Sequence, residues 1–148
     1  MSNKISKDDF VILLKETFAL GKDFSFSPTG DSMKPMLNGT TDTVVLTKKG
    51  EKLKKYDVAM YHRRRDNALV LHRVVKVTAE SYIMSGDNQY YFDYDITHSD
   101  VLAVVKSFNR KGKNISVRAV SYRIYIQLML LKKYSRILFS KIYHKFFR

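Results

Sequence analysis

Cysteine is absent from the 148-residue chain. This excludes disulfide bonds, cysteine nucleophiles and thiolate metal sites, and it leaves the redox compartment undetermined. The chain has four histidines, and their positions show no metal-ligand spacing such as H-E-x-x-H. We therefore expect a protein that holds no metal and needs no other cofactor.

Long uncharged stretches are also absent, because every window of about 18 residues contains a charged side chain. The opening segment, MSNKISKDDF, is polar, whereas a secretory signal needs a continuous apolar segment. The sequence thus indicates neither a membrane-spanning helix nor a signal peptide. We expect a cytoplasmic protein whose contact with a membrane, where it occurs, is peripheral.

Acidic side chains are missing from residues 101–148, which hold 12 of the 27 Lys and Arg residues. Residues 1–100 are nearly balanced, with 15 basic and 14 acidic side chains. Of the net charge of +13, +12 therefore belongs to residues 101–148. Such a block indicates an anionic partner: a phospholipid surface, a nucleic acid or an acidic peptide.

One stretch, GDSMKPML from Gly30 to Leu37, has the composition of a nucleophile loop. Gly30 and Asp31 suit a tight turn, and Pro35 suits the first turn of a short helix. Ser32 would then expose its hydroxyl where a loop becomes a helix, beside backbone N–H groups that can hold an oxyanion. A serine at a helix start is more often only a cap, so the motif alone leaves both interpretations open.

The three apolar residues that follow also have two interpretations. They form either the wall of a substrate channel for small side chains or a part of the core. These residues are Met33, Met36 and Leu37.

A second stretch, Leu69–Val77, reads as a strand with one histidine inside it. Alternation along a strand places Val70, His72 and Val74 on one face, and Arg73 on the other. A histidine among valines is either a partly buried structural residue or a general base.

A third stretch supplies carboxylates. Gly86-Asp87-Asn88 reads as a turn after a strand over residues 81–85, and Asp93 and Asp95 follow it. Serine, histidine and a carboxylate are the three parts of an activated nucleophile. An aspartate in a turn commonly bonds only its own backbone, so a structural role for Asp87 remains open.

The three stretches together resemble the signal peptidase I family, in the ER and archaeal branch that uses a histidine base. The matching segments are GDSMKPML around Ser32, YDVAMYH and VLHRVVKV around His72, and SGDNQYYFD up to Asp93. They occur in the family's order, over roughly residues 20 to 108. LexA-like self-cleaving repressors share the fold, but they carry a lysine where this chain has His72.

The resemblance implies that Ser32 is the nucleophile, His72 the general base and Asp93 the residue that orients it, with Asp95 in reserve. Some relatives have a second oxyanion donor two residues before the serine, where this chain has Gly30. Relatives are also normally anchored by a helix ahead of the serine, which this sequence does not show. The supporting residues implied are Gly30, Asp31, Met33, Pro35, Arg73, Gly86 and Asp87.

The fold implied is mainly β, a coiled antiparallel sheet of the LexA and signal peptidase type with a helix at each end. We expect an N-terminal helix within 1–22, a catalytic β domain over 23–120, and a basic amphipathic helix over 121–148. Ser6 and Asp9 predict the first helix start. The Arg63–Asn67 segment reads as a hairpin loop whose arginines are solvated or grip an anionic substrate. The strands expected are 24–27, 42–48, 56–61, 69–77, 81–85, 101–108 and 115–117.

The tail has a helical period from Tyr122 onward, with apolar residues at spacings of three and four. Its basic and aromatic side chains fit an anionic membrane surface, while packing on the domain or a dimer contact explains the stripe equally well. Nucleic acid is the weakest partner, since no binding motif accompanies the charge. The oligomeric state is left open. The stripe consists of Ile124, Leu128, Leu131, Ser135, Leu138, Ile142 and Phe146.

The function expected is a serine endopeptidase that cleaves a leader or signal-type peptide. Its activity should rise through roughly pH 6–7, where an ordinary histidine becomes neutral. The alternative is a catalytically silent adaptor of the same fold that binds peptides or an anionic membrane through its tail. A self-processing protease related to LexA-like repressors is a third hypothesis, which lacks a DNA-binding domain ahead of Ser32.

Overall fold

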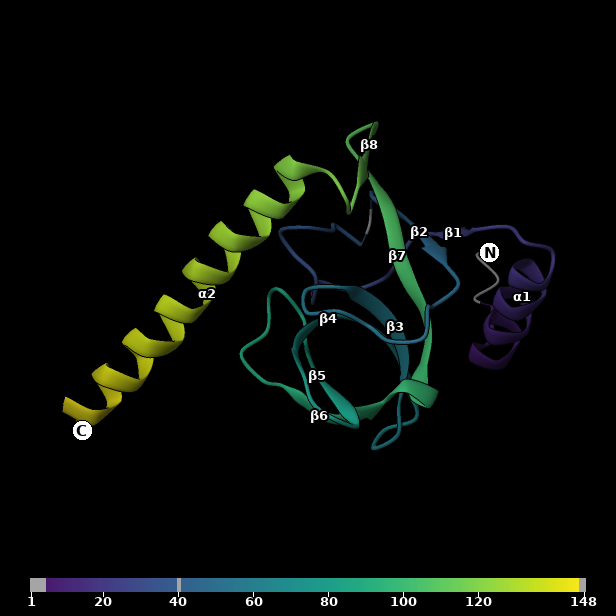
Figure 1. Cartoon of the computed structure of the whole chain (residues 1–148). Helices are drawn as coiled ribbons and strands as arrows, with labels where there is room; N and C mark the ends of the chain where they lie inside the picture. The colour runs from purple at the N-terminus through teal and green to yellow at the C-terminus, as the bar shows by residue number, and fades with distance from the viewer. Residues whose placement is uncertain (1–4, 40, 147–148) are drawn as a thin grey trace.

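The computed structural model describes residues 5–39 and 41–146 and is mainly β. One antiparallel sheet of eight strands curls into a half-barrel, and a helix lies near each end of the chain (Figure 1). This confirms the expected fold class. In chain order the elements are α1 (Lys7–Ala19), β1 (Phe24–Phe26), β2 (Thr43–Thr47), β3 (Val58–Arg63), β4 (Ala68–Val77), β5 (Ser81–Ser85), β6 (Asp93–Thr97), η1 (His98–Asp100), β7 (Val101–Arg110), β8 (Lys113–Ser116) and α2 (Val120–Phe146).

The strand order is β1-β2-β7-β3-β4-β5-β6, with β8 paired to the end of β7. Two strands separate β3 from β6 in this order, yet Tyr61 on β3 and Asp93 on β6 are joined by a 2.5 Å hydrogen bond. Such a contact requires the sheet to curl on itself. The curl therefore creates the polar cluster described below.

Both faces of the sheet are covered. Inside the curl, Tyr61, Val74 and Met84 belong to one buried cluster. The outer face packs under the Ser32 segment, α1 and the first half of α2, which contribute Met36, Leu14 and others to a larger cluster. Because β4 lies between the two clusters, His72 and Arg73 are both buried although they point to opposite faces.

Most predicted elements are present, and three predictions need correction. The segment after Ser32 forms consecutive turns rather than a short helix, with the N–H of Leu37 bonded to the carbonyl of Met33. Strand β6 was not predicted. The last short strand lies at Lys113–Ser116 rather than at residues 115–117.

Helix α1 begins as the sequence predicts, because the Ser6 hydroxyl accepts a hydrogen bond from the N–H of Asp9. Helix α2 packs only through its first half, where Lys133 is the last buried residue. The second half extends away from the sheet (Figure 1). Among the described residues, no helix has the length and apolar character needed to cross a membrane.

Candidate active site

The centre of the candidate site is the imidazole of His72, which is only 2% exposed on the inner face of β4. Its Nδ1 lies 3.1 Å from the Tyr61 hydroxyl and 3.4 Å from the Asp93 carboxylate. The same hydroxyl donates a 2.5 Å hydrogen bond to Asp93. The Tyr61 hydroxyl therefore bridges His72 and Asp93, for which the sequence analysis expected a direct contact alone.

These contacts fix the tautomer of His72. A tyrosine has one hydroxyl proton, and Tyr61 gives it to Asp93, so its oxygen can only accept from the imidazole. An ionised Asp93 also only accepts. Nδ1 must therefore carry the proton, and Nε2 keeps the lone pair that a general base needs.

The charge state of His72 follows from its surroundings. Burial lowers the pKa of the imidazole to about 4, against the opposing effect of Asp93. The Arg63 guanidinium also lowers this pKa. His72 is thus a neutral acceptor throughout the neutral pH range.

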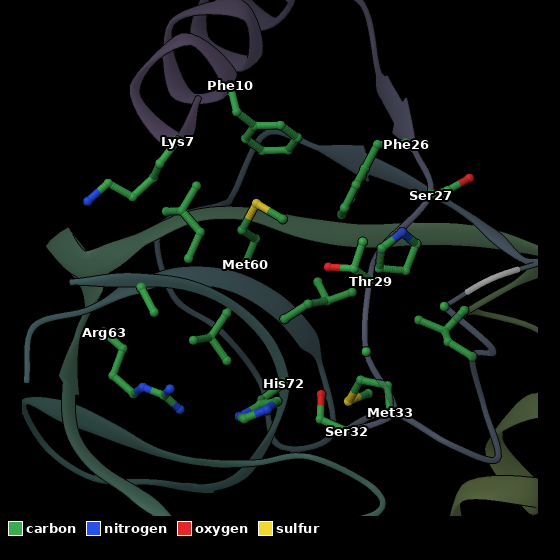
Figure 2. Close-up of a pocket in the computed structure, with 18 of the residues that line it drawn as sticks. Lys7, Phe10, Phe26, Ser27, Thr29, Ser32, Met33, Met60, Arg63 and His72 are labelled. Atoms are coloured by element: carbon green, nitrogen blue, oxygen red, sulfur yellow. The ribbon is translucent and has the colours of Figure 1, made fainter. Parts of the chain in front are cut away.

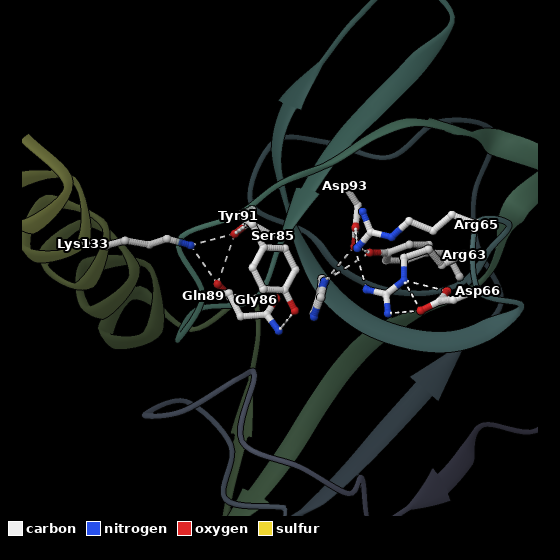
Figure 3. Close-up of polar contacts among 11 residues, drawn as sticks. Arg63, Arg65, Asp66, Ser85, Gly86, Gln89, Tyr91, Asp93 and Lys133 are labelled. Carbon is white, nitrogen blue, oxygen red and sulfur yellow. Dashed lines mark hydrogen bonds and ion pairs between the residues drawn. The ribbon is translucent and has the colours of Figure 1, made fainter. Parts of the chain in front are cut away.

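Asp93 is held by two arginines as well (Figure 3). Arg63 Nη1 lies 3.3 Å and Arg65 Nη2 2.7 Å from its carboxylate, and Arg64 pairs with Asp100 at 2.7 Å. The turn is solvated as expected, since the side chains of Arg64 and Arg65 are 64% and 56% exposed, and its arginines also pair with carboxylates of β6 and η1. Asp95 is exposed, and of these two carboxylates it is Asp93 that lies beside the imidazole.

Ser32 lies in the turn segment between β1 and β2. Gly30 there has a φ of +89°, a conformation that glycine adopts readily, and Asp31 pairs with Lys34 at 2.8 Å. Pro35 is exposed at the end of the segment. Within residues 5–39 and 41–146, the N–H of Ser32 donates to no other group, so it is available to an oxyanion.

The loop after β5 is hydrogen-bonded to the backbone of the Ser32 segment. The N–H of Asn88 donates to the Ser32 carbonyl at 2.8 Å, and the Asn88 side chain donates to the Asp31 carbonyl at 3.2 Å. A Cβ on Gly86 would lie 2.5 Å from that same Ser32 carbonyl, so only glycine fits at this position. The Gly-Asp-Asn element thus fixes the backbone of Ser32.

Asp87 has a different task, because it forms a buried ion pair with Arg73. Two parallel hydrogen bonds of 2.8 and 2.7 Å join them. The other three N–H groups of Arg73 donate to the Tyr56 carbonyl, the Tyr122 hydroxyl and the Met36 sulfur. All five guanidinium donors are satisfied, which is what a fully buried arginine requires.

Through its bonds to Tyr122 and Met36, Arg73 connects α2 to the Ser32 segment. Lys133 adds a second link, because its buried ammonium donates to the Gly86 carbonyl at 2.7 Å and to the Ser85 hydroxyl at 2.8 Å (Figure 3). Burial lowers the pKa of this lysine. The first half of the tail is therefore part of the framework that holds the loop under Ser32.

A cleft of about 780 Å³ opens beside Ser32 and His72, which both line it (Figure 2). Met33, Leu37, Phe10 and Met60 give it apolar walls. Met36 does not line the cleft; it is a core residue whose sulfur accepts from Arg73 and Tyr122. The channel-wall interpretation thus fits Met33 and Leu37, and the core interpretation fits Met36.

Ser32 and His72 share the cleft without a hydrogen bond between them in the described part of the chain. Catalytic hydrogen bonds are often long before substrate binds and shorten afterwards. The cleft is open to solvent at this point, since Ser32 is only half-buried.

Several site residues were not identified from the sequence. Tyr61 was seen only as a strand residue. Asn88 and two residues that line the cleft, Gln89 and Tyr91, were seen only as parts of a turn region. No local signal marks Tyr61, because its role depends on the sheet curl. Asn88 had a signal, since it belongs to the Gly-Asp-Asn element.

The site can thus be described from its own geometry: a neutral imidazole held by a hydroxyl and a carboxylate, and a serine in the same cleft whose backbone N–H has no hydrogen-bond partner among the described residues. Comparisons with other proteins add nothing to this description. A scan against known protein families found no match, and a search of characterised proteins found none either.

Proposed function

We propose that this chain is a serine endopeptidase resembling signal peptidase I, with Ser32 as nucleophile. The observation that carries the proposal is the shared cleft, in which Ser32 lies with a buried His72 whose Nδ1 faces Tyr61 and Asp93. The cytoplasmic, peripheral location expected from the sequence remains part of the proposal.

The mechanism follows from the atoms that face the cleft. Ser32 Oγ attacks the peptide carbonyl carbon while its proton passes to His72 Nε2. The C–N bond then breaks, and His72 gives this proton to the leaving amine. Water hydrolyses the ester by the same route, so the imidazole returns to its neutral form.

Two groups stabilise the charges that develop. The N–H of Ser32 donates to the oxyanion, in keeping with its lack of a partner among the described residues. Asp93, through its own contact and through Tyr61, holds the Nδ1 proton of the imidazolium. With Gly30 in place of a second side-chain donor, this oxyanion hole is weaker than one with two donors, by about 2.7–4 kcal/mol.

The substrate is best sought among leader or signal-type peptides. Beside Ser32 the cleft is lined by Met33 and Leu37, which fit small apolar side chains. Further along, Phe10 and Phe26 extend the apolar lining under α1. An extended peptide segment of several residues therefore fits the cleft better than a compact polar ligand.

A serine-directed acylating probe tests the proposal. Wild-type protein should acquire one probe molecule, located on Ser32 by mass spectrometry of its fragments, and Ser32→Ala should acquire none. Ser135→Ala, which changes an exposed serine in α2, is the matched control and should react as the wild type does. A leader-peptide library then identifies the bond that only the reactive proteins cleave.

The opposite outcome favours the adaptor. Peptides would then bind in the cleft with equal affinity in the wild type and Ser32→Ala, and neither protein would react or cleave. That result would remove Ser32 as a nucleophile and leave a binding domain.

The pH profile of kcat/KM provides a second test. Only neutral His72 accepts a proton, so activity is present above its pKa and lost below it. Burial lowers that pKa to about 4, which moves the expected rise from pH 6–7 to about pH 4. We expect an almost constant rate from about pH 5 to 7, measured by cleavage of one peptide.

A loss of activity caused by acid unfolding must be distinguished from one caused by protonation of His72. Circular dichroism at each pH shows where the fold is intact, and rates are compared only there. A midpoint near pH 6.5 in folded protein would mean that the titrating base is not the buried His72.

A further inference from the structure

The second half of α2 has an apolar face that is largely exposed in the described protein. After Lys133 only Ile137 is even half-buried, and the helix continues to Phe146. Leu131, Leu138 and Phe139 are 71%, 59% and 75% exposed. Large side chains grouped in this way mark an interaction surface.

The exposed face is directed away from the body of the protein. Of the five buried positions of α2, all but Leu130 are followed two residues later by a position of the exposed stripe; these four are Tyr122, Ile126, Met129 and Lys133. Two residues turn an α-helix by about 200°, so the two stripes lie on nearly opposite sides. One side of α2 is therefore fixed to the domain while the other faces outward.

Basic side chains border the outward face. Lys132 and Arg136 lie along one edge of the stripe, and Lys141 and Lys145 along the other, as the same helical geometry requires. Residues 101–148 contain no acid that could neutralise them. An apolar stripe with cationic edges and exposed aromatic rings matches the interface of an anionic bilayer.

The charge of the outward face also argues against a second copy of the chain as its partner. The stripe spacing of three and four residues would suit a helix pair, but both partners would bring only cations to its edges. Nucleic acid would accept the charges, yet it offers no surface for leucine and phenylalanine. An anionic lipid surface accommodates both the apolar stripe and its cationic edges.

We propose that α2 is an interfacial helix, which lies on anionic lipid with its outward stripe in the headgroup region while its inward stripe holds the domain. The thirteen residues from Tyr134 to Phe146 span about 20 Å. A helix of that length without packing is marginal in water, and the lipid surface supplies the burial that it lacks. This inference does not depend on peptidase activity.

Vesicle flotation with the full chain tests the proposal. Wild-type protein should bind phosphatidylglycerol vesicles and float with them, and should stay unbound with phosphatidylcholine vesicles. Leu131→Ser combined with Leu138→Ser should weaken binding by at least about tenfold. Ile12→Ser combined with Leu20→Ser, at exposed aliphatic positions of and after α1, is the matched control and should change nothing.

A second pair of variants tests the charges. Arg136→Gln, Lys141→Gln and Lys145→Gln together should weaken binding about a hundredfold, at roughly fivefold for each charge. Lys15→Gln, Lys22→Gln and Lys52→Gln remove the same charge from exposed sites elsewhere and should have little effect.

Three results would overturn the inference. The first is equal binding to both kinds of vesicle or to none. The second is a dimer in sedimentation experiments that the Leu131→Ser, Leu138→Ser variant abolishes. The third is binding of DNA or RNA that competes fully with the vesicles. Loss of probe reaction at Ser32 has no bearing on any of these outcomes.

Discussion

Asp93→Asn lowers kcat for peptide cleavage by about 10⁴-fold, on the mechanism proposed here. An asparagine amide can donate toward His72 Nδ1, which favours the tautomer with the proton on Nε2. That tautomer has no lone pair for the Ser32 proton. The imidazolium also loses the carboxylate that lies 3.4 Å from it. The measurement is kcat at neutral pH on the peptide that the wild type cleaves.

Tyr61→Phe provides the comparison for that variant. It removes the hydroxyl between His72 and Asp93 but leaves the carboxylate, so the loss should be only about tenfold, the value of one hydrogen bond. Equal losses in the two variants would show that Tyr61, and not Asp93, controls the tautomer. An unchanged rate in Asp93→Asn would remove the carboxylate from the mechanism.

The Arg73–Asp87 pair should give the largest effect on stability. Asp87→Ala leaves the buried guanidinium without its carboxylate, and we expect the free energy of unfolding to fall by about 3–5 kcal/mol. Urea denaturation followed by circular dichroism measures this change. Glu80→Ala, at an exposed carboxylate in the turn before β5, should stay within about 0.5 kcal/mol of the wild type.

A double variant shows whether charge or packing is responsible. Arg73→Met with Asp87→Leu removes both charges and keeps apolar volume, and it should recover much of the lost stability. If the double variant is as unstable as Asp87→Ala, the hydrogen bonds to Tyr56 and Tyr122 matter more than the ion pair.

The local parts of the fold were predictable from the sequence. Alternation in β4 places His72 and Arg73 on opposite faces, as the structure has them, and the Ser6 cap starts α1. Both depend on residues close together in the chain. Strand β6 was missed because Asp93-Tyr94-Asp95 lacks alternating apolar residues, and it forms through its pairing with β5.

The parts of the site that depend on tertiary structure were not predictable. The Tyr61–Asp93 hydrogen bond joins residues 32 positions apart, and it exists because the sheet curls. The arginine run likewise reaches Asp93 and Asp100 only in the folded chain, although Arg63 also pairs with Asp66 in its own hairpin. In α2 the sequence showed the continuous apolar stripe that includes Leu131 and Leu138, which is exposed in the structure. It did not reveal the second stripe, which packs on the domain and includes Lys133.

Lys133 and Tyr122 have a consequence for the order in which the site is completed. Translation adds them after every strand of the sheet. Until they emerge from the ribosome, the Gly86 carbonyl lacks its ammonium partner and Arg73 lacks one acceptor. The nascent chain can therefore form its sheet well before the loop that contacts Ser32 is locked, and α2, which is synthesised after the strands, completes these contacts.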